Sequence, residues 1–245
     1  MSSSEVFFPS DTTGHYANDT FHWSSASSQN STCSVEPGTP QDVATILKIL
    51  GATKVPFAVK GGGHTTNPGF SSTPGVQIAM TRFNAITYNA DEHIAELGAG
   101  LVWDEVYATL NPLGVNVVGE RVTGVGVAGY LLGAGGYSYL SNQYGLGVDN
   151  VEAYDLVLPS GEFKTITKAD MDLYFAIIGG FNNFGIVTKF TVKTHPQDLQ
   201  VWGGTISLLG DTVDQLNAAT VNFMNNVTDP KAAMLPSLSS WGLES

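Results

Sequence analysis

Three glycine-rich turns, at residues 60–64, 119–136 and 179–185, are the parts of this sequence best able to bind a ligand through the main chain. Glycine-rich turns expose consecutive backbone amides, and such amides hold phosphate oxygens. Because the donors are main-chain groups, this binding does not need many Lys or Arg side chains. Glycine is also the usual residue of an ordinary turn, so the set of three favours a phosphate site more than any single turn does.

His64 is the side chain in these turns that could contact a ligand directly. It follows Gly61, Gly62 and Gly63 and precedes Thr65. A histidine with such small neighbours can bring its ring to the edge of a bound molecule. The alternative is an imidazole that hydrogen-bonds within its own turn, and the residue pattern leaves both open.

Metal binding and serine hydrolysis have no support in the sequence. His15, His22, His93 and His195 are scattered and form neither an HxH nor an HExxH pattern, and Cys33 is the only cysteine. These spacings predict no metal site and allow no disulfide within the chain. The sequence also lacks the GxSxG pattern of a nucleophilic serine.

Residues 124–129 fit the pattern GxGxxG, and Asp149 follows at the distance typical of a nicotinamide dinucleotide site. Two observations count against that interpretation. Residues 120–123 do not form a buried strand pattern, and Gly133 and Gly135 would soon break the helix that must follow. A dehydrogenase built on this segment is therefore a weaker alternative.

The composition limits the class of protein and its partners. The chain has 245 residues, of which 42% are hydrophobic, and 10 Lys and Arg stand against 22 Asp and Glu, a net charge of −12. That length and apolar content can form a core, and the acidic balance argues against nucleic acid and anionic membranes as partners. No apolar run reaches the length of a membrane span. The first residues show no signal-peptide pattern, and we leave the localisation open.

The elements that must position the turns follow from periodicity and punctuation. Residues 1–34 are polar and predict a loosely structured arm, and a domain boundary is expected near 195–200. Helices are predicted at residues 40–51, 101–113, 170–178 and 211–226, and strands at 55–59, 76–80, 86–88, 94–97, 151–158, 163–166, 186–193 and 201–209.

Five motifs occur together in a fixed order. They are residues 59–65, 98–100 with Trp103 and Tyr107, 126–138, 144–150 and 179–188. This ordered set resembles the PCMH-type FAD-binding domain of the vanillyl-alcohol-oxidase superfamily. It is most similar to the berberine-bridge-enzyme-like FAD-linked oxidoreductases, in the style of their fungal members. The resemblance covers about residues 34–197.

The resemblance implies a domain organisation and a fold class. Residues 1–33 would be an N-terminal arm, 34–197 the FAD-binding domain, and 198–245 the incomplete start of a substrate domain in a C-terminally truncated chain. The expected fold class is α+β. Two mixed α/β subdomains, with two small mixed sheets flanked by helices, would hold the flavin between them, and an antiparallel substrate domain would begin after them.

The resemblance also implies the residues that bind FAD. His64 matches the histidine that the family bonds covalently to the flavin 8α-methyl. Relatives with a second bond, through a cysteine, would carry it near Val122, where this chain has none. The residues that match the family's loops around the cofactor are Lys60, Gly61, Gly62, Gly63 and Thr65 at the pyrophosphate, Val125 at the flavin face, Gly126, Gly129, Gly135, Gly136, Ser138, Tyr144 and Asn150 along the ring and pyrophosphate, and Gly185, Ile186 and Val187 near the adenosine.

The activity implied by the resemblance is that of an FAD-linked oxidoreductase of secondary metabolism. Hydride would pass from a small-molecule substrate to flavin N5, and oxygen would reoxidise the flavin to give hydrogen peroxide. Family members are longer and bring the catalytic base from the second domain, so no catalytic residue can be assigned in this chain. The alternative is a flavin-binding remnant without catalytic activity.

Overall fold

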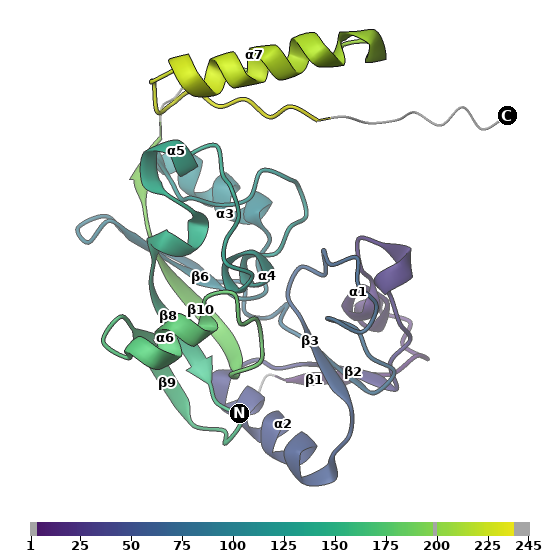
Figure 1. The fold of residues 1–245 in the computed structure, drawn as a ribbon. Helices are drawn as coiled ribbons and strands as arrows, with labels where there is room; N and C mark the ends of the chain where they lie inside the picture. The colour runs from purple at the N-terminus through teal and green to yellow at the C-terminus, as the bar shows by residue number, and fades with distance from the viewer. Residues whose placement is uncertain (1–3, 198–199, 238–245) are drawn as a thin grey trace, which may run out of the picture.

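The fold is built on a four-stranded sheet and a five-stranded sheet, each with helices beside it (Figure 1). The computed structural model describes residues 4–197 and 200–237. The α+β class predicted from the sequence is confirmed.

The first sheet has the order β1-β2-β4-β3. Its strands are β1 (Glu5–Phe7), β2 (Cys33–Glu36), β3 (Phe57–Lys60) and β4 (Val76–Ala79). Strand β1 is antiparallel to β2, whereas β2, β4 and β3 are parallel. A parallel connection needs a crossover, which α2 (Pro40–Thr53) provides between β2 and β3. The Thr39 side chain accepts a hydrogen bond from the Asp42 amide and so caps this helix.

The second sheet has the order β5-β6-β10-β8-β9. Its strands are β5 (Ile86–Asn89), β6 (Ile94–Gly98), β8 (Val151–Val157), β9 (Phe163–Thr167) and β10 (Ile186–Lys193). Every pair in it is antiparallel, so the expectation of two mixed sheets is wrong for this one. Short hairpins join β5 to β6 and β8 to β9, and hairpins produce antiparallel neighbours.

Smaller elements surround the sheets. They are α1 (His15–Thr20), η1 (Ser25–Ser27), α3 (Trp103–Leu110), η2 (Asn111–Leu113), β7 (Val115–Asn116), α4 (Val127–Leu132), α5 (Ser141–Tyr144), η3 (Gly147–Asn150), α6 (Met171–Ile177), β11 (His195–Pro196), η4 (Gly210–Thr212) and α7 (Val213–Asn226). Trp103, Tyr154 and Phe190 are among the largest fully buried side chains of the core. Across residues 4–197 and 200–237, we find no helix that combines the length and the apolar character of a membrane span.

The N-terminal residues do not form the loose arm that their polarity predicts. Strand β1 joins the first sheet, and the buried Tyr16 donates a hydrogen bond from its hydroxyl to the Ser31 carbonyl at 2.6 Å. The ring of His22 is buried and hydrogen-bonds to Ser71. Polar side chains can be buried when they find partners, which is why composition alone misjudged this segment.

The strand expected at residues 201–209 is also wrong. The chain runs there without a strand, and Trp202 is 97% exposed. A strand needs a neighbouring strand to pair with, and none of the described residues pairs with this segment. The helix expected next is confirmed as α7, which Figure 1 shows in yellow, apart from both sheets. The domain boundaries themselves stay a prediction.

Candidate functional site

The loop after β3 and the turn before α4 touch backbone to backbone. A Cβ on Gly62 would lie 2.5 Å from the amide nitrogen of Gly126 and 2.6 Å from its Cα, so only glycine fits at this contact. Backbone bonds hold the Gly126 side of the contact in place, from the Trp103 amide to the Val125 carbonyl and from the Val127 amide to the Leu101 carbonyl. The structure therefore brings together two of the glycine-rich segments singled out in the sequence.

The end of β6 joins the same place from the second sheet. A Cβ on Gly61 would lie 3.1 Å from the carbonyl oxygen of Ala99, and the Ala99 amide donates to the Thr188 carbonyl in β10 at 3.1 Å. Segments from both sheets and the start of α4 thus meet around residues 61–63. The main chain of the loop after β3, of the end of β6 and of the start of α4 therefore lies close together at this point.

His64 extends from this meeting point with a ring nitrogen that the protein does not use. Its Nε2 is buried and has no hydrogen-bond partner within the described part of the chain, whereas Nδ1 is not among such enclosed atoms. The imidazole stacks on the Trp23 ring, with centroids 4.8 Å apart and planes 18° from parallel. The hydrogen bond within its own turn, the alternative left open by the sequence, is not formed. A buried polar atom without a partner is uncommon in folded proteins, and here the imidazole is held by its stack on Trp23 rather than by a hydrogen bond from Nε2.

The Lys60 side chain lies beneath the loop. It is 6% exposed, its Nζ donates to the Asn18 carbonyl at 2.9 Å, and a Cβ on Gly63 would lie 2.6 Å from its Cε. Burial lowers the pKa of Lys60, and the nearby Asp19 carboxylate opposes that shift. The Lys60 ammonium group is therefore hydrogen-bonded to the N-terminal segment, and the Lys60 side chain packs against the loop at Gly63.

Asp19 makes stability depend on pH in a predictable direction. Its side chain is fully buried, and burial raises its pKa from 3.8 to about 6. The folded state therefore holds a proton more firmly than the unfolded chain does, and the stability gained from it is complete below pH 4 and is lost as the pH rises through 6. We expect this group to change the free energy of unfolding by about 3 kcal/mol across that window.

The Asp19→Asn variant tests this expectation by urea unfolding at several pH values. Its stability relative to wild type should rise between pH 4 and pH 7. An Asp91→Asn variant, at an exposed hairpin position, is the matched control and should follow the wild-type profile. Parallel profiles for wild type and Asp19→Asn would contradict the prediction.

A second group of predicted residues is built around His195 in β11. The Tyr144 ring stacks on His195 with centroids 3.6 Å apart, and Asn150 contacts the His195 Nε2 at 2.8 Å. The Asn150 amide also donates to the carbonyls of Tyr144 and Leu146. Burial lowers the pKa of His195, and Lys193 adds to this shift. Tyr144 and Asn150 therefore already have partners within the protein.

The turn after α4 is held by its own contacts. Gly135 has φ +46° and lies against the Val148 amide, a position that only glycine can take without strain. The Tyr130 hydroxyl donates to the Gly136 carbonyl, and the Ser138 amide donates to the Ser141 hydroxyl. These bonds fix the course of the main chain from α4 to α5.

The remaining predicted residues differ in what they can offer to a ligand. Gly129 is exposed in α4, and a Cβ there would meet no atom within 4 Å. Gly185 has φ +146°, while the Ile186 and Val187 side chains are buried in the core. Val125 is partly buried against the core. At the start of β10, only the main chain is therefore available.

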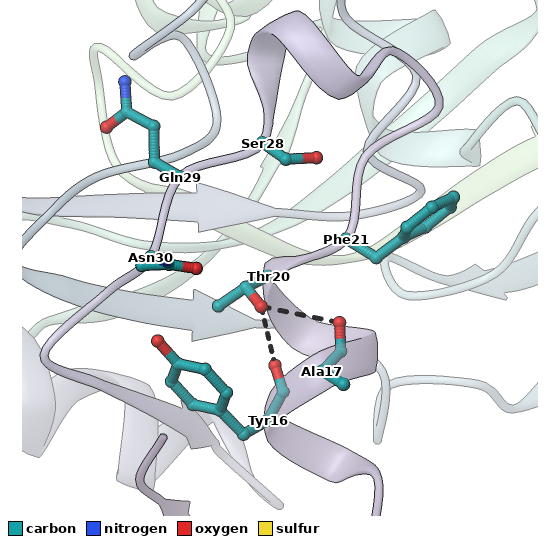
Figure 2. Close-up of a pocket in the computed structure, with 7 residues that line it drawn as sticks. All are labelled: Tyr16, Ala17, Thr20, Phe21, Ser28, Gln29 and Asn30. Atoms are coloured by element: carbon teal, nitrogen blue, oxygen red, sulfur yellow. Dashed lines mark hydrogen bonds between the residues drawn. The ribbon is translucent and has the colours of Figure 1, made fainter.

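A surface hollow of about 380 Å³ lies elsewhere, on the N-terminal part of the fold (Figure 2). It is lined by Tyr16, Ala17, Thr20, Phe21, Ser28, Gln29 and Asn30. Within it, the Thr20 hydroxyl donates hydrogen bonds to the carbonyls of Tyr16 and Ala17, which the dashed lines mark. None of the residues predicted for the site lines this hollow, so we do not assign the function to it.

Sequence reasoning missed Trp23 and the role of Ala99. Trp23 lies in the segment that the composition predicts to be a loose arm, and nothing in the local sequence indicates a contact between Trp23 and His64. Ala99 is part of the 98–100 motif, whose glycines could have indicated a close approach of backbones. In the part of the chain that is described, no group of three His, Cys, Asp or Glu could hold a metal ion.

Curated relatives include fungal flavoproteins. An FAD-linked oxidoreductase of Arthroderma benhamiae is 40% identical over 221 residues, which are 87% of this chain and 43% of the relative. The FAD-dependent monooxygenase macF of Penicillium terrestre is 40% identical over 177 residues, 71% of this chain and 34% of the relative. The chain thus spans less than half the length of these two relatives.

Solved structures share the fold. The 6-hydroxy-D-nicotine oxidase of Arthrobacter nicotinovorans matches with a TM-score of 0.73 and 24% identity over 79% of this chain and 42% of that one. The BBE-like 1 protein of Physcomitrella patens matches with a TM-score of 0.72 and 28% identity over the same shares. A glucooligosaccharide oxidase of Acremonium strictum, described with a 6-S-cysteinyl, 8α-N1-histidyl FAD, matches with a TM-score of 0.71 and 20% identity, over 79% and 41%.

The family model described as FAD binding domain matches residues 31–167, a stretch that runs from just before β2 to the end of β9. It includes the loop at residues 60–65, the end of β6 and the start of α4, the segments that the structure brings together. Since the match extends over more than half of the 245 residues, the chain belongs to the FAD binding domain family.

Proposed function

We propose that this protein is an FAD-linked oxidoreductase that oxidises a small molecule of secondary metabolism, with oxygen as the final electron acceptor. When bound, FAD supplies a hydride acceptor at N5 and passes the electrons on to oxygen, with hydrogen peroxide as the product. The family match supports the cofactor, and the curated relatives support the enzyme class. The chain spans only part of those relatives, so its substrate and turnover belong to the proposal.

The observation that carries the proposal is the position of His64. Its imidazole lies on the loop that meets Gly126 backbone to backbone, with Nε2 enclosed and Nδ1 as the ring nitrogen that is not enclosed. A site of this kind fits a ligand with both phosphates and a flat ring, since main-chain amides can hold the phosphates and the imidazole can reach the ring. The chain's surplus of acidic side chains does not oppose it, because the donors are backbone groups.

In this proposal, the amides of residues 61–63 and 126 hold the pyrophosphate, and the turn from Gly135 to Asn150 runs along the cofactor. The main chain at Gly185 would lie at the adenosine half. His64 would form a single covalent bond to the flavin 8α carbon through Nδ1, the nitrogen that is not enclosed. A second bond through sulfur is not available, because Cys33 lies in β2, paired with Val76 of the first sheet.

The absorption spectrum of the purified protein tests cofactor binding, and peroxide release tests turnover. We expect flavin bands in the visible range, and peroxide with at least one substrate from a panel of alcohols, sugars and phenols. A colourless protein that takes up no FAD would overturn the proposal. A yellow protein that releases no peroxide with any substrate would favour the non-catalytic remnant. A rise in melting temperature with NAD but not with FAD would favour the dehydrogenase alternative.

A further inference from the structure

The segment that precedes β2 fastens the His64 loop on both sides of the histidine. The Trp23 amide donates to the Gly63 carbonyl at 3.0 Å, and the Ser27 hydroxyl donates to the Thr65 carbonyl at 2.7 Å. These two bonds reach the residues directly before and after His64. The backbone of the loop is therefore held independently of the stacked rings.

The Trp23 side chain contacts His64 without being part of the buried core. It is 62% exposed and is not part of the buried core, yet its ring lies nearly parallel to the His64 imidazole. This is the one ring contact that Trp23 makes within the described residues. An exposed indole that stacks on an imidazole restricts rotation of the smaller ring while adding little buried core.

The consequence for His64 is a restricted choice of orientation. One face of the imidazole is covered by the indole and Nε2 is enclosed, which leaves the edge with Nδ1 as the reactive edge. Bond formation is fastest when the reacting atoms are held in the required geometry before they react. Stacking of aromatic rings is strong enough to favour one ring orientation about fivefold to tenfold.

We propose that Trp23 is a positioning residue for the attachment of FAD to His64, holding the imidazole plane so that Nδ1 faces the flavin 8α carbon. This inference rests on the proposed function. In the attachment, one C–H bond of the 8α-methyl group and the imidazole N–H bond break, and one C–N bond forms. The two electrons and two protons remain on the flavin until oxygen removes them as hydrogen peroxide.

The experiment follows the rate of covalent attachment. The protein is expressed under riboflavin depletion and mixed with FAD, and samples are precipitated with acid at intervals to measure the flavin that stays with the protein. We expect Trp23→Ala to slow attachment about fivefold to tenfold, since the stack is lost. Trp23→Phe, which keeps an aromatic ring, should restore most of the wild-type rate.

Phe21→Ala is the matched control, because Phe21 is a similarly exposed aromatic of the same segment and makes no ring contact within the described residues. It should attach FAD at the wild-type rate. The fluorescence of FAD during titration gives the affinity before the bond forms, and the melting temperature reports folding. Both should be nearly equal in all variants. The NMR resonances of the His64 ring should lose their aromatic ring-current shift in Trp23→Ala alone, since Trp23→Phe keeps a ring over the imidazole.

Three results would overturn the inference. Attachment by Trp23→Ala at the wild-type rate would show that the stack does not position the imidazole. A loss of melting temperature and FAD affinity in proportion to the slower attachment would show a merely structural role. Wild-type protein that binds FAD but never retains it after acid would overturn both the inference and the covalent bond of the proposed function. Because this last result is measured on the wild-type protein alone, it distinguishes a failure of the proposed function from a failure of the Trp23 inference.

Discussion

A Gly62→Ala variant is expected to bind FAD about tenfold to a hundredfold more weakly than the wild type, the range that corresponds to the usual cost of overpacking. The new Cβ would lie 2.5 Å from the Gly126 amide nitrogen and 2.6 Å from the Gly126 Cα, and these two Gly126 atoms belong to backbone that cannot rotate away. The two turns must then separate. Since both supply amides to the same proposed phosphate site, their separation removes hydrogen bonds that FAD needs.

The measurement is an FAD titration in a His64→Ala background, where covalent attachment cannot hide weaker binding. Gly126→Ala should weaken binding in the same way, because its Cβ would press on Gly62. Gly51→Ala in α2 is the matched control, since a Cβ there meets no atom within 4 Å, and it should bind FAD as the background variant does. Equal affinities for Gly62→Ala and Gly51→Ala would contradict the assignment of this contact to the cofactor.

The sequence predicted elements well where the signals are local. The helix expected from residue 40 is α2, which begins at Pro40, and the strand expected at residues 186–193 is β10. Strand 201–209 had the right residue types but lacks a partner strand within the described chain, and pairing is decided by tertiary structure. The loose arm predicted from the polar residues before β2 is wrong, because these residues are buried through hydrogen bonds to partners such as Ser31 and Ser71, and the composition does not reveal such partners.

The glycines of the candidate site could be predicted because their role is steric and local. Gly62 and Gly126 must lack a Cβ because their backbones are in contact, and glycine-rich turns of this kind are visible in the sequence. Which turns meet was inferred from the resemblance alone, because no periodicity brings residue 62 to residue 126. The Trp23 stack on His64 joins a tryptophan and a histidine from distant segments, and no spacing rule predicts it.

A His64→Ala variant is expected to lose all covalently bound flavin while it still binds FAD reversibly. The amides that we propose to hold the pyrophosphate belong to neighbouring residues and remain in place. The substitution should change folding stability little. It removes a buried Nε2 that had no hydrogen-bond partner, so no satisfied bond is lost, and the stack on Trp23 contributes only about 1 kcal/mol.

Acid precipitation after loading with FAD separates the two forms of binding. Wild-type protein should carry flavin fluorescence into a denaturing gel, whereas the flavin of His64→Ala should stay in the supernatant. His93→Asn is the matched control, because His93 is exposed in the β5–β6 hairpin with φ +52°, which asparagine tolerates. It should keep covalent flavin. Retention of flavin by His64→Ala would place the attachment on another residue, and the glycine loop would then bind FAD without reacting with it.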